Sequence, residues 1–479
     1  MSRDRVAKRR VAVSRDELMS EAASQPTDLC GWVRREVEED SPQFDGPFGS
    51  RRVFYCDFTA TSRFLPTLER HLRTTVGPLY GSTHSRTSVT AEQSTFFLDD
   101  ARQIVRTAVG AGEDDAVLFV GSGTTAAVAL LARALDFGSA GEDDAPVLLV
   151  GPFEHHSNLL PWRELAGAEL HYVNVDAREE RVDLRDLESR LRHVRQKYGD
   201  DRAVIGCFAA ASNITGVLTD TDAVSSLLHK YGALSFWDYA TGAAYLDMAM
   251  NSSTDPQAYK DAIYFSGHKL IGAPSSPGVL VAKRRLFRSA APDKPGGGTV
   301  SFVERDGHVY RKNVEQREEG GTPDLVGAVR LALALRLKRD IGIAEIAARD
   351  ASVTRGLLTR VGSVANLVVL GKGRAFDERL PVVSFAVRAP AALGRRLLHH
   401  NFVARLLNDL FGIQCRAGCL CAGPYAQELL GIDRQLAVEY RNLLAESDRL
   451  DRHHLRRTNE YTEFEAYRSA DFQLTKVGQ

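Results

Sequence analysis

Seven short apolar runs between residues 116 and 282 constrain the fold of this chain more than any other feature. Each is five to seven residues long and rich in β-branched or aromatic residues, and longer amphipathic stretches separate several of them. Strands that alternate with helices predict an α/β domain with a mainly parallel, here seven-stranded, sheet. The expected strands are 116–121, 147–151, 170–175, 203–209, 233–237, 261–266 and 277–282, and the clearest expected helices are 124–135, 183–198 and 221–231.

The rest of the chain divides by texture around this core. With 479 residues it is long enough to form more than one lobe. Residues 286–323 are rich in Gly, Pro and charge and are interpreted as loops, and a long helix is expected over 324–338. The predicted parts are an N-terminal, partly irregular arm with one short helix (1–45), a large domain (46–325), a smaller α+β domain (326–434) and a charged C-terminal tail with no assigned sheet role (435–479).

Composition excludes several classes of function. The formal net charge is −1, so no overall field attracts nucleic acid. No apolar run reaches the roughly 18–20 residues that cross a bilayer. The basic N-terminus lacks the apolar core of a secretory signal and is interpreted as a solvated arm, so we expect a cytoplasmic protein without membrane or nucleic-acid partners.

Reactive residues follow three of the expected strands. Gly121-Ser-Gly-Thr-Thr125 joins a strand to a helix, where free backbone N–H groups and the helix dipole favour a phosphate, although a plain helix cap has the same composition. Asp238 ends a second strand, at the edge where parallel sheets bind ligands. Ser266-Gly-His-Lys269 ends a third and offers a lysine next to groups that bind phosphate. This order of phosphate cup, carboxylate and lysine suits pyridoxal 5′-phosphate (PLP), because the carboxylate keeps the pyridine nitrogen protonated and the lysine forms a Schiff base.

A set of segments in fixed order extends this pattern from about residue 53 to 432. Together they resemble the class V aminotransferase group of fold-type I PLP enzymes, close to the cysteine desulfurase and selenocysteine lyase branch. The matching segments are Tyr55-Cys-Asp-Phe-Thr-Ala-Thr61, Ser122-Gly-Thr-Thr125, Glu154-His-His-Ser-Asn158 with Pro161-Trp162, Ser212-Asn213 with Gly216, Asp238, Ser266-Gly-His-Lys269, Gly296-Gly-Gly-Thr299, Gly320-Gly-Thr-Pro323 and Arg416-Ala-Gly-Cys-Leu-Cys-Ala-Gly-Pro424.

The resemblance implies a role for each matched residue. Lys269 forms the Schiff base, His155 stacks on the ring and assists proton transfer, and Cys421 is the nucleophile. The other implied roles are pairing with the pyridine nitrogen (Asp238), contact with the phenolic oxygen (Thr241), phosphate binding (Gly123, Thr124, Thr125, Ser266, His268), contact with the cofactor or substrate carboxylate (Asn213), substrate carboxylate binding (Arg416) and contact with a partner subunit's phosphate (Thr299), which implies a homodimer.

Three cysteines crowd into residues 415–421. The resemblance implies that Cys421 attacks the sulfur of cysteine, giving a protein persulfide and alanine. Cys415, Cys419 and Cys421 also allow a zinc or iron–sulfur site, but C-x3-C-x-C is not a usual zinc spacing. Cys415 is interpreted as a buried apolar residue. Cys419 either receives the persulfide or fills space.

The chain departs from the family at three points. Thr241 stands where desulfurases usually have Gln, Cys419 and Leu420 stand where that branch has His-His, and the tail 435–479 shows no match to a second carboxylate-binding Arg. The predicted function is therefore a PLP-dependent cysteine desulfurase with an amino-acid substrate and a sulfur-acceptor protein. The alternatives are a class V lyase or transaminase for another amino acid, and a catalytically weakened scaffold or sulfur-carrier partner.

Overall fold

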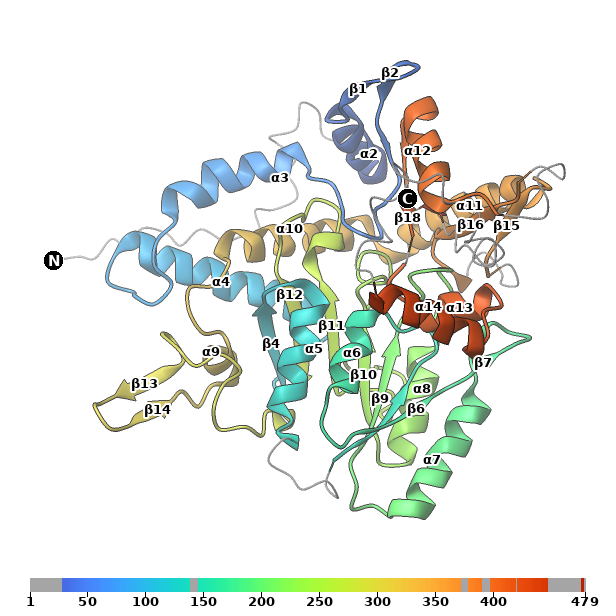
Figure 1. The fold of residues 1–479 in the computed structure, drawn as a ribbon. Coiled ribbons are helices and arrows are strands. Elements are labelled where there is room, and N and C mark those ends of the chain that lie inside the picture. The colour runs from blue at the N-terminus through green and yellow to red at the C-terminus, as the bar shows by residue number, and fades with distance from the viewer. Residues whose placement is uncertain are drawn as a thin grey trace.

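A seven-stranded sheet forms the centre of the computed structural model, which describes residues 28–137, 145–371, 378–389, 397–418, 420–446 and 475–477 (Figure 1). Its strand order is β4-β12-β11-β10-β9-β5-β6. Only β12 runs antiparallel to its neighbours. All seven predicted strands are present, and the predicted fold class is confirmed. The bounds are β4 (Asp115–Val120), β5 (Val147–Val150), β6 (Glu169–Tyr172), β9 (Val204–Ala209), β10 (Leu234–Asp238), β11 (Ala262–Ser266) and β12 (Gly278–Lys283).

Helices cover both faces of the sheet, which explains why its strands read as continuous apolar runs. Successive residues of β4 alternate between two cores: Val117 and Phe119 pack on one face, and Ala116 and Leu118 on the other. The first face carries α4 (Val89–Ala108), α7 (Leu184–Tyr198), α8 (Thr221–Lys230) and α10 (Leu325–Ile341), and the second carries α5 (Gly123–Ala134) and α6 (Leu160–Arg163).

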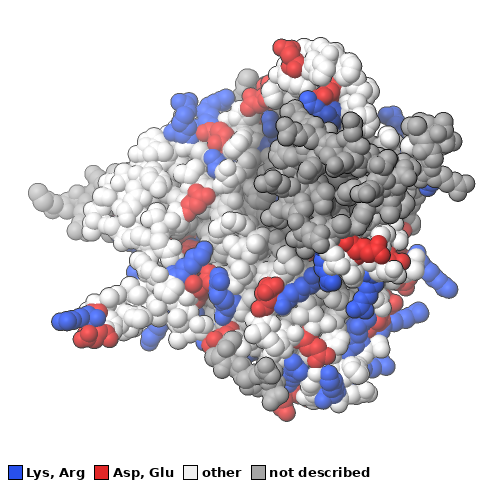
Figure 2. All heavy atoms as spheres, viewed as in Figure 1, with Lys and Arg blue, Asp and Glu red and all other residues white. Residues whose placement is uncertain are grey.

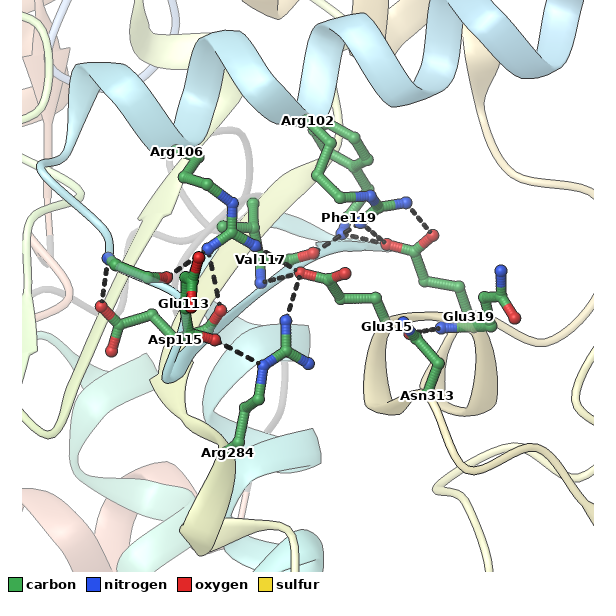
Figure 3. Close-up of polar contacts among 12 residues, drawn as sticks. Arg102, Arg106, Glu113, Asp115, Val117, Phe119, Arg284, Asn313, Glu315 and Glu319 are labelled. Carbon is green, nitrogen blue, oxygen red and sulfur yellow. Dashed lines mark hydrogen bonds and ion pairs between the residues drawn. The ribbon is translucent and has the colours of Figure 1, made fainter.

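Two glutamates close the edge of the sheet at β4 (Figure 3). Glu315, on α9 (Val314–Glu318), accepts a hydrogen bond from Val117 N at 3.0 Å, and Glu319 accepts one from Phe119 N at 2.7 Å. Arg106 and Arg102 on α4 neutralise these carboxylates at 2.7 Å each. The outward N–H groups of the edge strand are thus satisfied by charged side chains.

The segment 286–323 is more ordered than predicted. Besides α9 it holds a hairpin of β13 (Val300–Val303) and β14 (His308–Tyr310), which projects from the body in Figure 1. The interpretation as loops alone was wrong, because these strands are short and largely exposed and so lack the apolar alternation of a buried strand.

A four-stranded sheet lies in the C-terminal third. It has the order β15-β16-β19-β18 and includes residues of the tail, for which no sheet role was predicted. The tail residues 475–477 pair with both β16 and β18, whereas 447–474 lie outside the described residues. The elements are β15 (Leu367–Val369), β16 (Val383–Val387), β18 (Arg416–Ala417), β19 (Thr475–Val477), α11 (Ile343–Gly362), α12 (His400–Phe411), α13 (Gly423–Leu429) and α14 (Arg434–Glu446).

The N-terminal segment contacts both the core around the seven-stranded sheet and the C-terminal third of the chain. From residue 28 it holds one helix, as expected of the arm, and then a hairpin, and β3 pairs in parallel with β17 just before the cysteine cluster. Residues 1–27 lie outside the described part. The remaining elements are α2 (Leu29–Glu39), β1 (Gln43–Gly46), β2 (Gly49–Arg52), β3 (Phe54–Tyr55), α3 (Pro66–His71), β7 (Val175–Asp176), β8 (Arg181–Val182) and β17 (Ile413–Gln414).

The surface shows no single-sign field. On the face in Figure 2, basic and acidic side chains are interspersed, in keeping with the formal net charge of −1. Among the described residues, no helix has both the length and the apolar character needed to span a membrane.

Candidate active site

A cavity of about 200 Å³ opens where β9, β10 and β11 end, at the edge of the sheet predicted to bind a ligand. It brings together predicted residues that are up to 292 positions apart in the sequence, from 124 to 416. A larger cavity, of about 670 Å³ and bordered by α2, α10 and α11, contains none of them. The predicted residues that line the smaller cavity are Thr124, Thr125, His155, Asn213, Asp238, Thr241, Ser266, His268, Lys269 and Arg416.

Asp238 and Lys269 form the charged centre of this cavity. Asp238 ends β10 in register with Ala209 on one side and Tyr264 on the other, and Lys269 ends the single helical turn that follows β11. Burial raises the pKa of Asp238 to about 6, although the Ala240 N–H at 2.7 Å and the charge of Lys269 oppose the shift. Burial also lowers the pKa of the Lys269 amine, against the attraction of Asp238. At neutral pH a carboxylate therefore faces an amine that gives up its proton more readily than a surface lysine.

A cradle of hydroxyl groups surrounds the N-terminus of α5. Thr124 N and Thr124 Oγ1 lie 3.0 and 3.2 Å from Ser266 Oγ, and Thr125 Oγ1 lies 2.7 Å from Ser157 Oγ. Gly123 has φ +58°, and a Cβ there would stand 2.5 Å from Ser266 Oγ, so only glycine allows this close approach. His268 lines the same cavity, with Nδ1 3.1 Å from Thr61 Oγ1. Hydroxyls and free amides at a helix N-terminus are suited to a phosphate.

His155 also lines the cavity, supported by buried groups that the sequence did not single out individually. Its Nδ1 accepts a hydrogen bond from Ser157 N at 3.0 Å, which leaves the proton of the neutral ring on Nε2. Beside it, buried Glu154 accepts from Ala209 N at 2.8 Å and from Asn158 Nδ2, and burial raises the pKa of Glu154 well above its usual value. Glu154 thus connects the turn that carries His155 to β9. Glu154 and His155 both belong to the motif Glu154-His-His-Ser-Asn158. This motif is the sequence feature from which the position of Glu154 in the site could have been predicted.

Asn213 and Thr241 are buried polar side chains on the cavity wall. Asn213 Nδ2 donates a hydrogen bond to Leu420 O, so this residue also holds the cysteine loop. Asn213 Oδ1 is buried and has no hydrogen-bond partner within the described part of the chain. A buried acceptor without a partner is costly, and a donor on a bound ligand would satisfy it.

Arg416 and Cys421 meet at the side of the cavity. Arg416 lies on β18, and its Nη2 is 3.1 Å from Cys421 Sγ. Cys421 is half-buried, with φ +57°. Cys415 is half-buried rather than fully buried, and burial raises its pKa to about 11. Cys419 lies outside the described residues, and no group of three His, Cys, Asp or Glu side chains among those described is placed to hold a metal ion.

Thr299 lies away from this cavity. Its side chain is fully buried at the base of the β13–β14 hairpin, where Thr299 Oγ1 donates to Gly296 O at 2.7 Å. The structure therefore does not bring it together with the other predicted residues of the same chain.

The residues present fit PLP. The cavity supplies an amine with a lowered pKa, a buried carboxylate, a histidine ring, a hydroxyl cradle at a helix N-terminus and the unpartnered Asn213 Oδ1. Each matches a group that the cofactor presents: aldehyde, pyridine nitrogen, ring face, phosphate and, for the acceptor Asn213 Oδ1, the phenolic hydroxyl of the ring.

Comparisons with known proteins agree with this fit. The model of the family described as aminotransferase class-V matches residues 54–433. The chain is 26% identical over 396 residues to a probable cysteine desulfurase of Halalkalibacterium halodurans, covering 81% of this chain and 89% of the relative. It is 27% identical over 396 residues to one of Staphylococcus aureus, covering 81% and 88%. A solved apo cysteine desulfurase from Thermococcus onnurineus NA1 superposes with a TM-score of 0.65 at 25% identity, covering 82% of this chain and 94% of that one. The chain belongs to the aminotransferase class-V family and is a PLP-dependent enzyme of fold type I.

Proposed function

We propose that this enzyme is a cysteine desulfurase that takes sulfur from L-cysteine onto Cys421 and releases L-alanine. The observation that carries the proposal is the 3.1 Å contact between Arg416 Nη2 and Cys421 Sγ, because Arg416 also lines the cavity that holds Lys269 and Asp238. A thiol is thereby held beside the place where an amino acid would be bound. The names of the similar proteins support the same reaction.

PLP, when bound, supplies an electron sink that makes the bonds around the substrate's α-carbon easier to break. Thr124, Thr125, Ser266 and His268 are proposed to hold its phosphate, Gly123 to leave room for it, Asp238 to pair with its ring nitrogen, and His155 and Thr241 to contact the ring. Lys269 would anchor the cofactor through its Nζ and, once released from it, would carry a proton on the same atom. The lowered pKa of Lys269 suits that role, since an amine must be neutral to accept a proton.

Cys421 and Arg416 divide the remaining work. Arg416 binds the substrate carboxylate and presents positive charge to Cys421 Sγ, which favours the reactive thiolate. In the transfer, Cys421 Sγ forms a bond to the substrate sulfur as the substrate's carbon–sulfur bond breaks. The electron pair of that bond stays on the former β-carbon, which takes a proton and becomes the methyl group of alanine. Cys421 retains the sulfur as a persulfide.

Product analysis after incubation with L-cysteine tests the proposal. With a thiol reductant the wild type should release alanine and sulfide in equal amounts, and Cys421→Ser should release no sulfide while keeping the visible absorbance of the bound cofactor. Cys415→Ser is the matched control, because this neighbouring thiol has a raised pKa and does not line the cavity. A keto acid product, or sulfide release that survives Cys421→Ser, would refute the proposal.

The proposal extends to a homodimer and a sulfur-acceptor protein. The projecting hairpin exposes Phe302 (59%), Val303 (61%) and Val309 (57%), apolar side chains that a second copy would cover. That contact would bring the loop containing Thr299 toward the other subunit. Sedimentation of the wild type and of Phe302→Ser tests this: we expect a dimer that the substitution weakens, and a monomeric wild type would contradict it.

A further inference from the structure

His156 follows the predicted catalytic His155 directly, yet its ring serves a different part of the molecule. Its Nε2 accepts a hydrogen bond from the backbone N–H of Gly423, 3.1 Å away and 267 residues later in the sequence. An imidazole nitrogen accepts a hydrogen bond only when it carries no proton. The pKa of His156 is lowered, first by burial and then by the charge of Arg163, so the ring is neutral and able to accept.

The backbone of His156 holds the same loop from the other side. His156 N donates to Cys421 O at 2.7 Å, so one residue contacts the loop at positions 421 and 423. Asn213 Nδ2 donates to Leu420 O and fixes the position before. Three backbone groups of the loop, at positions 420, 421 and 423, are therefore bonded to the large domain.

Apolar contacts reinforce these bonds. Phe153, three residues before His156, packs edge-to-face on Tyr425 with ring centroids 4.7 Å apart, and both rings are buried. Leu420 and Ala422, on each side of the cysteine, are buried as well. The turn 153–156 and the loop 420–425 thus pack as one unit.

Cys421 needs such support because its own backbone is strained. Its φ of +57° lies in the left-handed region that side chains other than glycine rarely adopt. A conformation of this kind is unfavourable and persists only when surrounding contacts impose it. Bonds to the carbonyl of Cys421 itself and to the amide of Gly423 are well placed to impose it.

We propose that His156 is a positioning residue that fixes the Cys421 loop, and hence Cys421 Sγ beside Arg416, through its paired bonds to Cys421 O and Gly423 N. It does not touch the reacting atoms but acts through the loop. The part of the inference that concerns sulfur transfer depends on the function proposed above, whereas the clamp on the loop does not.

Three substitutions at this position separate the ring's bond from its bulk. His156→Gln places an amide oxygen close to where Nε2 lies, so Gly423 N keeps an acceptor. His156→Asn has the same chemistry but is one methylene too short, and His156→Leu fills space without an acceptor. His193→Leu, at an exposed position on α7, is the control for loss of a histidine elsewhere.

The rate of hydrogen exchange at the Gly423 amide measures its hydrogen bond to His156 directly, without any activity measurement. In the cofactor-loaded protein we expect exchange about tenfold faster in His156→Asn and His156→Leu than in the wild type, as for the loss of one hydrogen bond. His156→Gln should remain near the wild type. If His156→Leu does not fold, the Gln and Asn variants, which differ by one methylene, still decide the question.

The rate of sulfide release from cysteine measures the effect of this hydrogen bond on the reaction. We expect kcat to fall about tenfold to a hundredfold in His156→Asn, since small misplacements of a reacting group cost that much, with KM and the cofactor's visible absorbance unchanged. Unchanged exchange in both Asn and Leu variants would overturn the clamp, and faster exchange with an unchanged kcat would overturn the positioning role. If the exchange pattern holds but the wild type releases no sulfide, the clamp stands and only the proposed function is refuted.

Discussion

The two walls of the cavity are built in different ways. Asp238 ends β10 and Lys269 ends the single helical turn after β11, so a sheet that is buried on both faces fixes their positions. Arg416 and Cys421 stand on a two-residue strand and an irregular loop, held by a few hydrogen bonds and apolar contacts from distant segments. The sheet wall resists small changes, whereas the loop wall depends on a few bonds. We therefore expect substitutions in the sheet wall to affect the cofactor and those in the loop wall to affect the substrate and its sulfur.

Lys269→Ala is the most severe test of the sheet wall. Without Nζ the cofactor loses its covalent anchor and the reaction loses its proton carrier. We expect sulfide release at background and no visible absorbance near about 420 nm, the region typical of lysine-bound PLP. Lys312→Ala, at an exposed position, is the control and should match the wild type. An unchanged spectrum of Lys269→Ala would show that the cofactor is anchored elsewhere.

Asp238→Asn should act on activity and on stability in opposite directions. Loss of the carboxylate that pairs with the cofactor's ring nitrogen should lower kcat about 10²- to 10³-fold, a typical loss for a group that controls a proton. Without cofactor, the carboxyl has a folded pKa of about 6 against the usual 3.8. The contribution of this carboxyl to stability is then fully present below about pH 4 and is lost as pH rises through about 6, because ionising the buried group is costly.

The free energy of unfolding of the protein without cofactor measures the effect of Asp238 on stability. Asp238→Asn removes the ionisation, so above pH 6 the variant should be more stable than the wild type by an amount on the order of 3 kcal/mol, from 1.36 kcal/mol per pKa unit. Denaturant unfolding at pH 5 and pH 8 measures it. If the free energy of unfolding depended on pH equally in the two proteins, the proposed cost of ionising the buried Asp238 would be refuted.

The same difference between the walls explains what the sequence could and could not predict. Gly123, Thr124, Asp238 and Lys269 follow buried strands, and alternation of strands with helices is enough to bring strand ends to one edge. All seven strands were predicted for this reason. To predict the cavity at that edge, no contact between distant segments had to be known beyond the order of the strands.

The loop wall depends on contacts between distant segments, which local patterns do not encode. Nothing near residue 156 indicates that its ring meets Gly423, and nothing near Asn213 indicates that its amide meets Leu420. The short pairing of residues 475–477 with β16 and β18 was missed for the same reason, since three residues carry too little periodicity to predict a strand. The projecting hairpin was missed because its exposed strands lack a buried face.

Arg416→Lys is the milder test of the loop wall. Lysine keeps the charge but loses the planar, forked donor set that suits both a carboxylate and Cys421 Sγ. Loss of a charged hydrogen bond worth about 1.5–3 kcal/mol should lower kcat/KM for cysteine about 10- to 100-fold. The visible absorbance of the bound cofactor should stay as in the wild type. Loss of the cofactor from this variant would show that the two walls are not independent.

Glu319→Gln tests whether the sheet wall is as robust as its construction suggests, and should have the smallest effect on activity. Glu319 pairs with Arg102 at 2.7 Å with side chains only 10% and 13% exposed, and it accepts the Phe119 N–H at the edge of the sheet (Figure 3). Glutamine removes the carboxylate that pairs directly with the buried Arg102 and leaves only the more distant charges of Glu315 and Asp99, so the free energy of unfolding should fall by about 2–4 kcal/mol.

The exposed pair Arg34–Glu38 provides the matched control for that substitution. Its side chains are 77% and 48% exposed, and Glu38→Gln should change stability by at most about 0.5 kcal/mol. In Glu319→Gln we expect kcat and absorbance to stay within about twofold of the wild type, because β12 and β11 separate β4 from Asp238 on β10 and the sheet should absorb a change at its edge. A large loss of activity at preserved folding would mean that the edge is coupled to the site, and that the sheet wall too depends on a few bonds.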